Sequence, residues 1–277
     1  MKLKLTRVNV MLAVVVLALA GFFLRLAQMA MAFDDAGRVT GKGVVFFSLF
    51  SIAVTVLFAL YSLTLKRRKG ISAIAGQDLP VLAVSAAATV LMLGGSAALL
   101  IRPLPTADAT DRIIAIGGIL TALCWGAVAA MRYLDKKLHA GLFMVPALYY
   151  VVALVLRFRF WTRDPIIIDY CYDLFALISL MCANFHLGGF CMEEGQRRLT
   201  AFYTLCGIFF SAAALVQSGK AAGLTYAAAI LWLLANLWLL LRPSRQRSAP
   251  FTAAVEVTEE PAEEAETDET EETGDLP

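Results

Sequence analysis

Charged residues are scarce in this chain, and they are unevenly placed. Only 17% of the 277 residues are charged, whereas 60% are hydrophobic. A soluble globular domain carries about 25% charged residues, so this composition excludes the ordinary soluble class. Residues 248–277 hold 11 of the 22 acids and no lysine or arginine, which leaves the rest of the chain with a net charge of 24 − 11 = +13.

Cysteines are few, and the common catalytic motifs are missing. The five cysteines lie in apolar segments and none forms a CxxC pair, so neither a disulfide framework nor a zinc site is expected. The sequence contains no HExxH, Walker or GxSxG motif. We therefore predict no cofactor and no metal site, and an enzyme is not the favoured class.

One short segment resembles an enzyme family. Residues 193–198, EEGQRR, match the EExxxR element of the CAAX-type intramembrane metalloproteases. In that family histidine motifs follow this element, whereas the two histidines of this chain, His139 and His186, both precede it. Because the histidines precede the EExxxR element, the metal site that the resemblance implies cannot form in the same way. We expect the charges of residues 193–198 to mark a helix end at the membrane surface.

A series of apolar runs separated by short polar ones dominates the sequence. A run of about 20 apolar residues crosses a bilayer as a helix. We therefore predict an all-α fold, in which residues 1–247 form a polytopic membrane bundle of about eight transmembrane helices and residues 248–277 form a disordered acidic tail. The predicted spans are 8–31, 44–65, 81–101, 113–133, 142–161, 165–190, 200–217 and 223–241.

Basic residues determine the predicted orientation. If the N-terminus lies inside, the cytoplasmic flanks hold 15 of the 24 lysines and arginines, including the KRRK cluster at 66–69. Because basic flanks tend to stay on the cytoplasmic side, we expect both termini in the cytoplasm and the chain in the cell membrane. The lipid bilayer is the expected partner, and no nucleic-acid partner is expected.

The third span is rich in small residues. Ala87, Gly94 and Ala98 fall on one face of a helix. Small residues let helix backbones approach each other in a membrane, so we expect this face to pack against a neighbouring helix.

The fifth and sixth spans form a predicted hairpin. Aspartate is a favoured helix N-cap and proline a favoured first helical residue, so Asp164-Pro165 predicts that the sixth helix starts there. This hairpin is also where the chain places most charge inside its own apolar segments.

The charges inside the spans are the candidate functional residues. Asp169 and Asp173 are four residues apart and share a helix face. Arg157 is predicted at the depth of Asp169 on the preceding helix, and Arg25 lies inside the first span. An ionised side chain at the bilayer centre costs about 2.5–3.5 kcal/mol on insertion scales. These residues must therefore form pairs, become neutral or face a hydrated cavity.

Two functions fit this pattern. The first is a small secondary transporter or permease for a solute or ion, in which Asp173 is the coupling or substrate carboxylate and Asp169, Arg157 and Arg25 are its gating partners. The alternative is a non-transporting sensor, scaffold or accessory subunit. Its buried charges would clamp helices together, and its cytoplasmic loops and tail would bind another membrane protein.

Overall fold

The computed structural model confirms the all-α membrane fold. It describes residues 7–31, 42–67, 69–74, 78–101, 109–161 and 170–242, and these residues contain helices and no strand. Each predicted span corresponds to one long helix. The helices are α1 (Arg7–Met31), α2 (Lys42–Thr64), α3 (Leu79–Leu100), α4 (Ala109–Tyr133), α5 (Gly141–Trp161), α6 (Cys171–Gly189), α7 (Arg197–Ala214) and α8 (Lys220–Leu240). The acidic tail and Asp169 lie outside the described residues.

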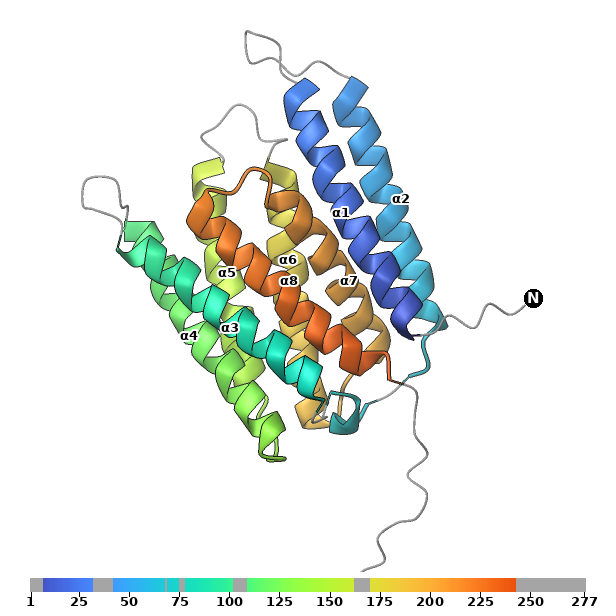
Figure 1. The fold of residues 1–277 in the computed structure, drawn as a ribbon, viewed down its shortest axis with the longest axis vertical. Coiled ribbons are helices and arrows are strands. Elements are labelled where there is room, and N and C mark those ends of the chain that lie inside the picture. The colour runs from blue at the N-terminus through green and yellow to red at the C-terminus, as the bar shows by residue number, and fades with distance from the viewer. Residues whose placement is uncertain are drawn as a thin grey trace, which may run out of the picture. The chain divides into compact units, whose positions relative to one another are not determined.

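The helices run alternately up and down, so both described chain ends lie at one end of the bundle (Figure 1). We call the end that holds the start of α1 and the finish of α8 the terminal end, and the other the opposite end. Helix α3 packs against α4 and α8, α6 packs against α5 and α7, and α7 also packs against α8. The α1–α2 pair joins this group mainly through α7.

Helix α7 differs from the other seven. In the described part of the chain, every long helix except α7 has the length and apolar composition to cross a membrane. Helix α7 has four neighbouring helices, and 14 of its 18 residues are buried. Because other helices surround it, α7 buries polar residues such as Thr200, Thr204 and Ser211 against protein. The sequence predicted about eight spans, and seven of the described helices meet the criterion of length and apolar composition.

Small residues bring α3 and α8 close together, but on a different face from the predicted one. Gly94 is exposed, and nothing lies within 4 Å of the position that its Cβ would take. Gly95 is buried, and a Cβ there would lie 3.0 Å from the backbone oxygen of Ala221 and 3.0 Å from Cγ2 of Thr225. The prediction that Gly94 packs against a neighbouring helix was wrong, because α3 is rotated about its axis so that Gly95 faces α8.

We expect Gly95→Leu to lower the free energy of unfolding by about 1–3 kcal/mol, because the new side chain would push the backbone of α8 away from α3. The matched variant Gly94→Leu should change it little, since that position is open. Titration with a denaturing detergent in mixed micelles would measure both. Equal losses in the two variants would contradict a specific close approach of α8 at Gly95, because leucine favours a helix more than glycine does at both positions.

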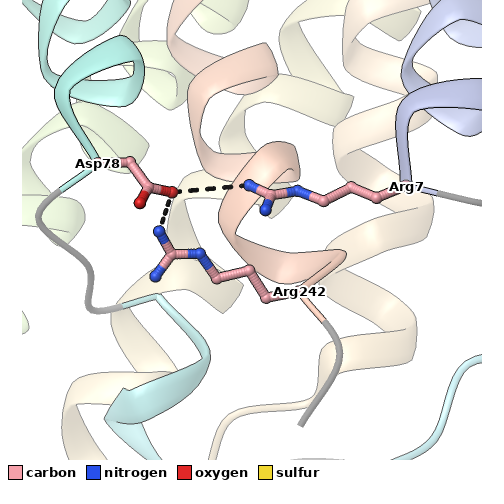
Figure 2. Close-up of polar contacts among 3 residues, drawn as sticks. All are labelled: Arg7, Asp78 and Arg242. Carbon is pink, nitrogen blue, oxygen red and sulfur yellow. Dashed lines mark ion pairs between the residues drawn. The ribbon is translucent and has the colours of Figure 1, made fainter. Parts of the chain in front are cut away.

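An ionic cluster ties three helices together at the terminal end (Figure 2). The carboxylate of Asp78, at the start of α3, forms ion pairs with Arg7 of α1 and Arg242 after α8. The Arg7 guanidinium carbon also lies 3.5 Å from the ring centroid of Trp238 on α8. The cluster thus links α1 directly to α3 and α8, with which it shares few other contacts.

We expect Asp78→Asn to lower the free energy of unfolding by about 1 kcal/mol, because the side chains are partly exposed and exposed ion pairs are weak. The loss should shrink at high salt, which screens such pairs. Asp135→Asn removes an exposed acid at the same end of the bundle and serves as the control. Stability measured at two salt concentrations tests this, and a loss independent of salt would contradict an electrostatic role.

Candidate functional site

The candidate residues that the structure describes lie toward the opposite end of the bundle. Arg25 comes from the last two turns of α1, Arg157 from the last two turns of α5, and Asp173 from the first turn of α6. Asp169 and the predicted helix start at Asp164-Pro165 lie outside the described residues, so the predicted contact between Arg157 and Asp169 stays a prediction. The described helix begins at Cys171, which places Asp173 nearer the helix start than expected.

Asp173 is buried and only partly satisfied. Its exposed fraction is 8%. The hydroxyl of Tyr226, on α8, is a hydrogen-bond partner of its carboxylate. Its Oδ1 atom has no hydrogen-bond partner among the described residues. The position in the first turn of α6 favours a negative charge, because the helix dipole is positive there.

Tyr226 connects Asp173 to Arg157. The Arg157 Nη1 atom donates a hydrogen bond of 2.7 Å to the Tyr226 hydroxyl oxygen, and its guanidinium carbon lies 5.5 Å from the ring centroid. Arg157 also acts electrostatically on the Asp173 carboxylate. The three side chains therefore form one network that joins α5, α6 and α8, in which Asp173 and Tyr226 are buried and Arg157 is half-buried. Sequence reasoning missed Tyr226, because a single tyrosine in an apolar span has no local signal.

Two further tyrosines line the α5 side of this network. Tyr149 and Tyr150 are both buried, and both act electrostatically with Arg157. The Tyr150 hydroxyl has no hydrogen-bond partner within the described parts of the chain. Gly117 of α4 lets Tyr149 approach, since a Cβ at this glycine would lie 2.7 Å from its ring. Buried polar groups thus gather around Arg157 from several helices.

Arg25 reaches the same region from α1. Its side chain is fully buried, and its Nη1 atom donates a 2.7 Å hydrogen bond to the Gln28 Oε1 atom. Its guanidinium carbon lies 4.7 Å from the ring centroid of Tyr172, the neighbour of Asp173 on α6. Arg25 also acts electrostatically on Asp173. The structure therefore brings together Arg25, Arg157 and Asp173, which are far apart in the sequence.

A small pocket with both polar and apolar lining adjoins Arg157. It has a volume of about 250 Å³ and lies between α3, α4, α5 and α8. Its lining includes Arg157, Asp111 and Thr110, together with Leu99 and Ile114. Asp111 lies in the first turn of α4, at the opposite end of the bundle. Arg157 therefore stands between this pocket and the Tyr226–Asp173 pair.

A larger groove lies between the α1–α2 pair and α6–α7. Its volume is about 530 Å³, and its lining includes Gln28, Tyr172 and phenylalanines of α6 and α7. The Ser51 and Thr55 hydroxyls that line it donate to carbonyl groups of their own helix. Its surface is therefore mostly apolar, which suits lipid chains better than a polar solute.

The histidine and cysteine residues do not form a metal site in the parts of the chain that are described. The His186 ring stacks on Tyr203, with 5.4 Å between ring centroids, which is a packing contact. The five cysteines form no disulfide with one another in the described part of the chain.

Comparison with known proteins adds no relative. The chain is a multi-pass helical membrane protein with a buried charged network near one end, and no protein-family model, curated protein or solved structure matches it.

Proposed function

We propose that this chain is a small secondary transporter. Its solute would enter the pocket at the opposite end and bind Arg157, and Asp173 would be the coupling carboxylate. The observation that carries the proposal is the arrangement of Arg157, which lines the pocket and at the same time shares Tyr226 with a buried, partly unsatisfied Asp173.

The cost of burying charge supports a functional role. Ionisable residues inside a membrane are expensive, and they commonly mark ion or substrate pathways. A purely structural pair would be expected to satisfy both carboxylate oxygens, because an unsatisfied buried acceptor costs about 1–3 kcal/mol. Here Asp173 Oδ1 is unsatisfied in the described part of the chain.

The arrangement also suggests how binding and coupling would be linked. A solute with an anionic group would compete with Asp173 for the Arg157 guanidinium, since arginine binds carboxylates through several donors at once. Loss of this partner would favour binding of a proton or cation by Asp173. Solute binding in the pocket would then promote ion binding at Asp173. A coupled carrier requires such a linkage between solute binding and ion binding.

The orientation belongs to the same proposal. Most of the basic residues of the described chain lie at the terminal end, and Lys66, Arg67, Lys69, Lys136 and Lys137 are among them. Because basic flanks tend to remain cytoplasmic, the terminal end would face the cytoplasm of a cell membrane. The pocket beside Arg157 would then open to the outside.

The test is thermal unfolding of the purified full chain in detergent against a panel of sodium salts of small organic acids, amino acids and inorganic anions. We expect at least one compound to raise the unfolding temperature of the wild type, and Asp173→Asn to abolish or alter the pH dependence of that shift. Asp78→Asn, an acid in the terminal-end cluster, should retain it. Uptake of the same compound into proteoliposomes under a pH gradient would then test transport directly.

The alternative expected from the sequence is a non-transporting scaffold, sensor or accessory subunit. If no compound shifts the unfolding temperature and no uptake occurs, the transporter proposal fails. The Arg157–Tyr226–Asp173 network would then be a clamp between α5, α6 and α8, and the exposed basic end would be the surface to test for a membrane-protein partner.

A further inference from the structure

Another buried cation lies near the terminal end, far from the proposed solute site. Arg132 belongs to the last turn of α4, and only 5% of it is exposed. Its Nη2 atom donates a 2.7 Å hydrogen bond to Oδ1 of Asn236 on α8. Its Nε and Nη1 atoms are buried and have no hydrogen-bond partner among the described residues. Two charged donor groups are thus available inside the protein.

The side chains around Arg132 are held in place by contacts of their own. Its guanidinium carbon lies 5.8 Å from the ring centroid of Trp232, and that ring stacks on Trp125 with 4.8 Å between centroids. The Trp232 Nε1 atom donates to Oδ1 of Asn184, 3.2 Å away. Trp125 Nε1 is another buried donor without a partner in the described part of the chain. The cluster is therefore rigid and has more donors than acceptors.

The two asparagines do not supply the missing acceptors. The Asn236 Nδ2 group donates to the Trp232 carbonyl, and the Asn184 Nδ2 group donates to the Leu180 carbonyl, so both amides are fixed by their own helices. Asn236 Oδ1 accepts from Arg132, and Asn184 Oδ1 accepts from Trp232. No acceptor oxygen of either amide is turned toward Nε or Nη1 of Arg132.

The charge of Arg132 also has no acidic counterpart in the described part of the chain. Within the described residues no carboxylate forms an ion pair with it, and the group that acts on it electrostatically is the Cys191 thiol. A guanidinium stays charged in proteins, and a buried charge without a counter-charge is strongly unfavourable. The end of α4 favours a cation through its dipole, but the dipole gives Nε and Nη1 no acceptor. A non-protein anion is the simplest group that completes this site.

We propose that Arg132, held in position by Asn236 and Trp232, forms an oxyanion-binding site near the terminal end. The ligand chemistry is a phosphate or carboxylate group, since the planar guanidinium presents several donors that match such oxygens. The oxyanion would come from a free anion or from the phosphate of an anionic lipid. This site is separate from the Arg157 pocket, and the inference does not rest on the transporter proposal.

The first arm of the test uses inorganic phosphate as the probe. The full chain is unfolded thermally in a non-ionic detergent with sodium phosphate, or with sodium chloride at the same ionic strength. We expect phosphate to raise the unfolding temperature by about 2–4 °C once it exceeds its dissociation constant about fivefold. Arg132→Met should lose this shift. Arg198→Gln, which changes a terminal-end arginine that donates to the Leu65 carbonyl, should keep it.

The second arm replaces free phosphate with lipid. The chain is placed in nanodiscs of phosphatidylcholine, with or without phosphatidylglycerol. Stabilisation by phosphatidylglycerol that disappears in Arg132→Met, without any effect of free phosphate, would assign the site to a lipid phosphate. No stabilisation by either probe, or stabilisation that Arg132→Met retains, would overturn the proposal.

A further variant keeps the test usable if Arg132→Met does not fold. Arg132→Lys retains the charge but not the planar set of donors, so it should weaken binding of the active probe about tenfold. Unchanged affinity in Arg132→Lys would contradict oxyanion recognition by the guanidinium.

Discussion

Replacing Asp173 by alanine is expected to lower the free energy of unfolding by about 3–5 kcal/mol, because it removes a buried carboxylate that acts electrostatically on the half-buried Arg157 and the fully buried Arg25. Arg157 would retain its hydrogen bond to Tyr226 but would lose the negative charge beside it. The Tyr226 hydroxyl would also lose a partner. Reversible unfolding by a denaturing detergent in mixed micelles would measure the loss.

The double variant Asp173→Ala/Arg157→Met tests the reason for this loss. If the penalty comes from an uncompensated cation, removing that cation should recover part of it, and the two single effects should not add. Strict additivity would show that Asp173 and Arg157 do not interact, and the network around Tyr226 would lose its basis. Asp173→Asn keeps an acceptor oxygen and should cost less than Asp173→Ala.

Replacing Trp232 by alanine should lower the free energy of unfolding by about 3–5 kcal/mol, as is usual for a large buried aromatic side chain. Trp232 is fully buried, stacks on Trp125 and donates to Asn184. Its loss would leave a cavity where α4, α6 and α8 meet and would leave Asn184 Oδ1 without its donor. Thermal and detergent-induced unfolding should both report a large decrease.

Trp238 provides a matched control on the same helix. It is only partly buried, and its ring contacts Arg7 at the terminal end. Trp238→Ala should therefore cost clearly less than Trp232→Ala. Trp232→Phe keeps an aromatic ring but removes the donor to Asn184, so we expect an intermediate loss of about 1–3 kcal/mol. Equal effects of Trp232→Ala and Trp238→Ala would contradict the central role of the Trp125–Trp232 stack.

The two proposals concern different ends of the bundle and can fail separately. Solute binding that depends on Asp173 but not on Arg132 would support the pocket beside Arg157 alone. Phosphate or lipid stabilisation that depends on Arg132, without any transport, would make the chain a membrane protein with a bound structural anion. The variants are matched so that each outcome identifies one site.

The sequence by itself determined the number and places of the long helices. A bilayer requires about 20 apolar residues for each crossing helix, so composition and the spacing of polar breaks were sufficient. The free-energy cost of placing a charged side chain inside a bilayer identified Arg25, Arg157 and Asp173 as residues that need partners. The predicted seventh span is the exception, because α7 lacks the apolar composition that the other long helices of the described chain have, and four helices surround it.

Only the tertiary structure decided which partners these residues meet. Tyr226 is 53 residues after Asp173 in the chain, and Asn236 is 104 residues after Arg132. The rotation of each helix about its axis determines which of its residues face a neighbouring helix. On α3, for example, Gly95 packs against α8, whereas Gly94 does not. That rotation depends on close packing among several helices at once, and no local pattern in one apolar segment encodes it.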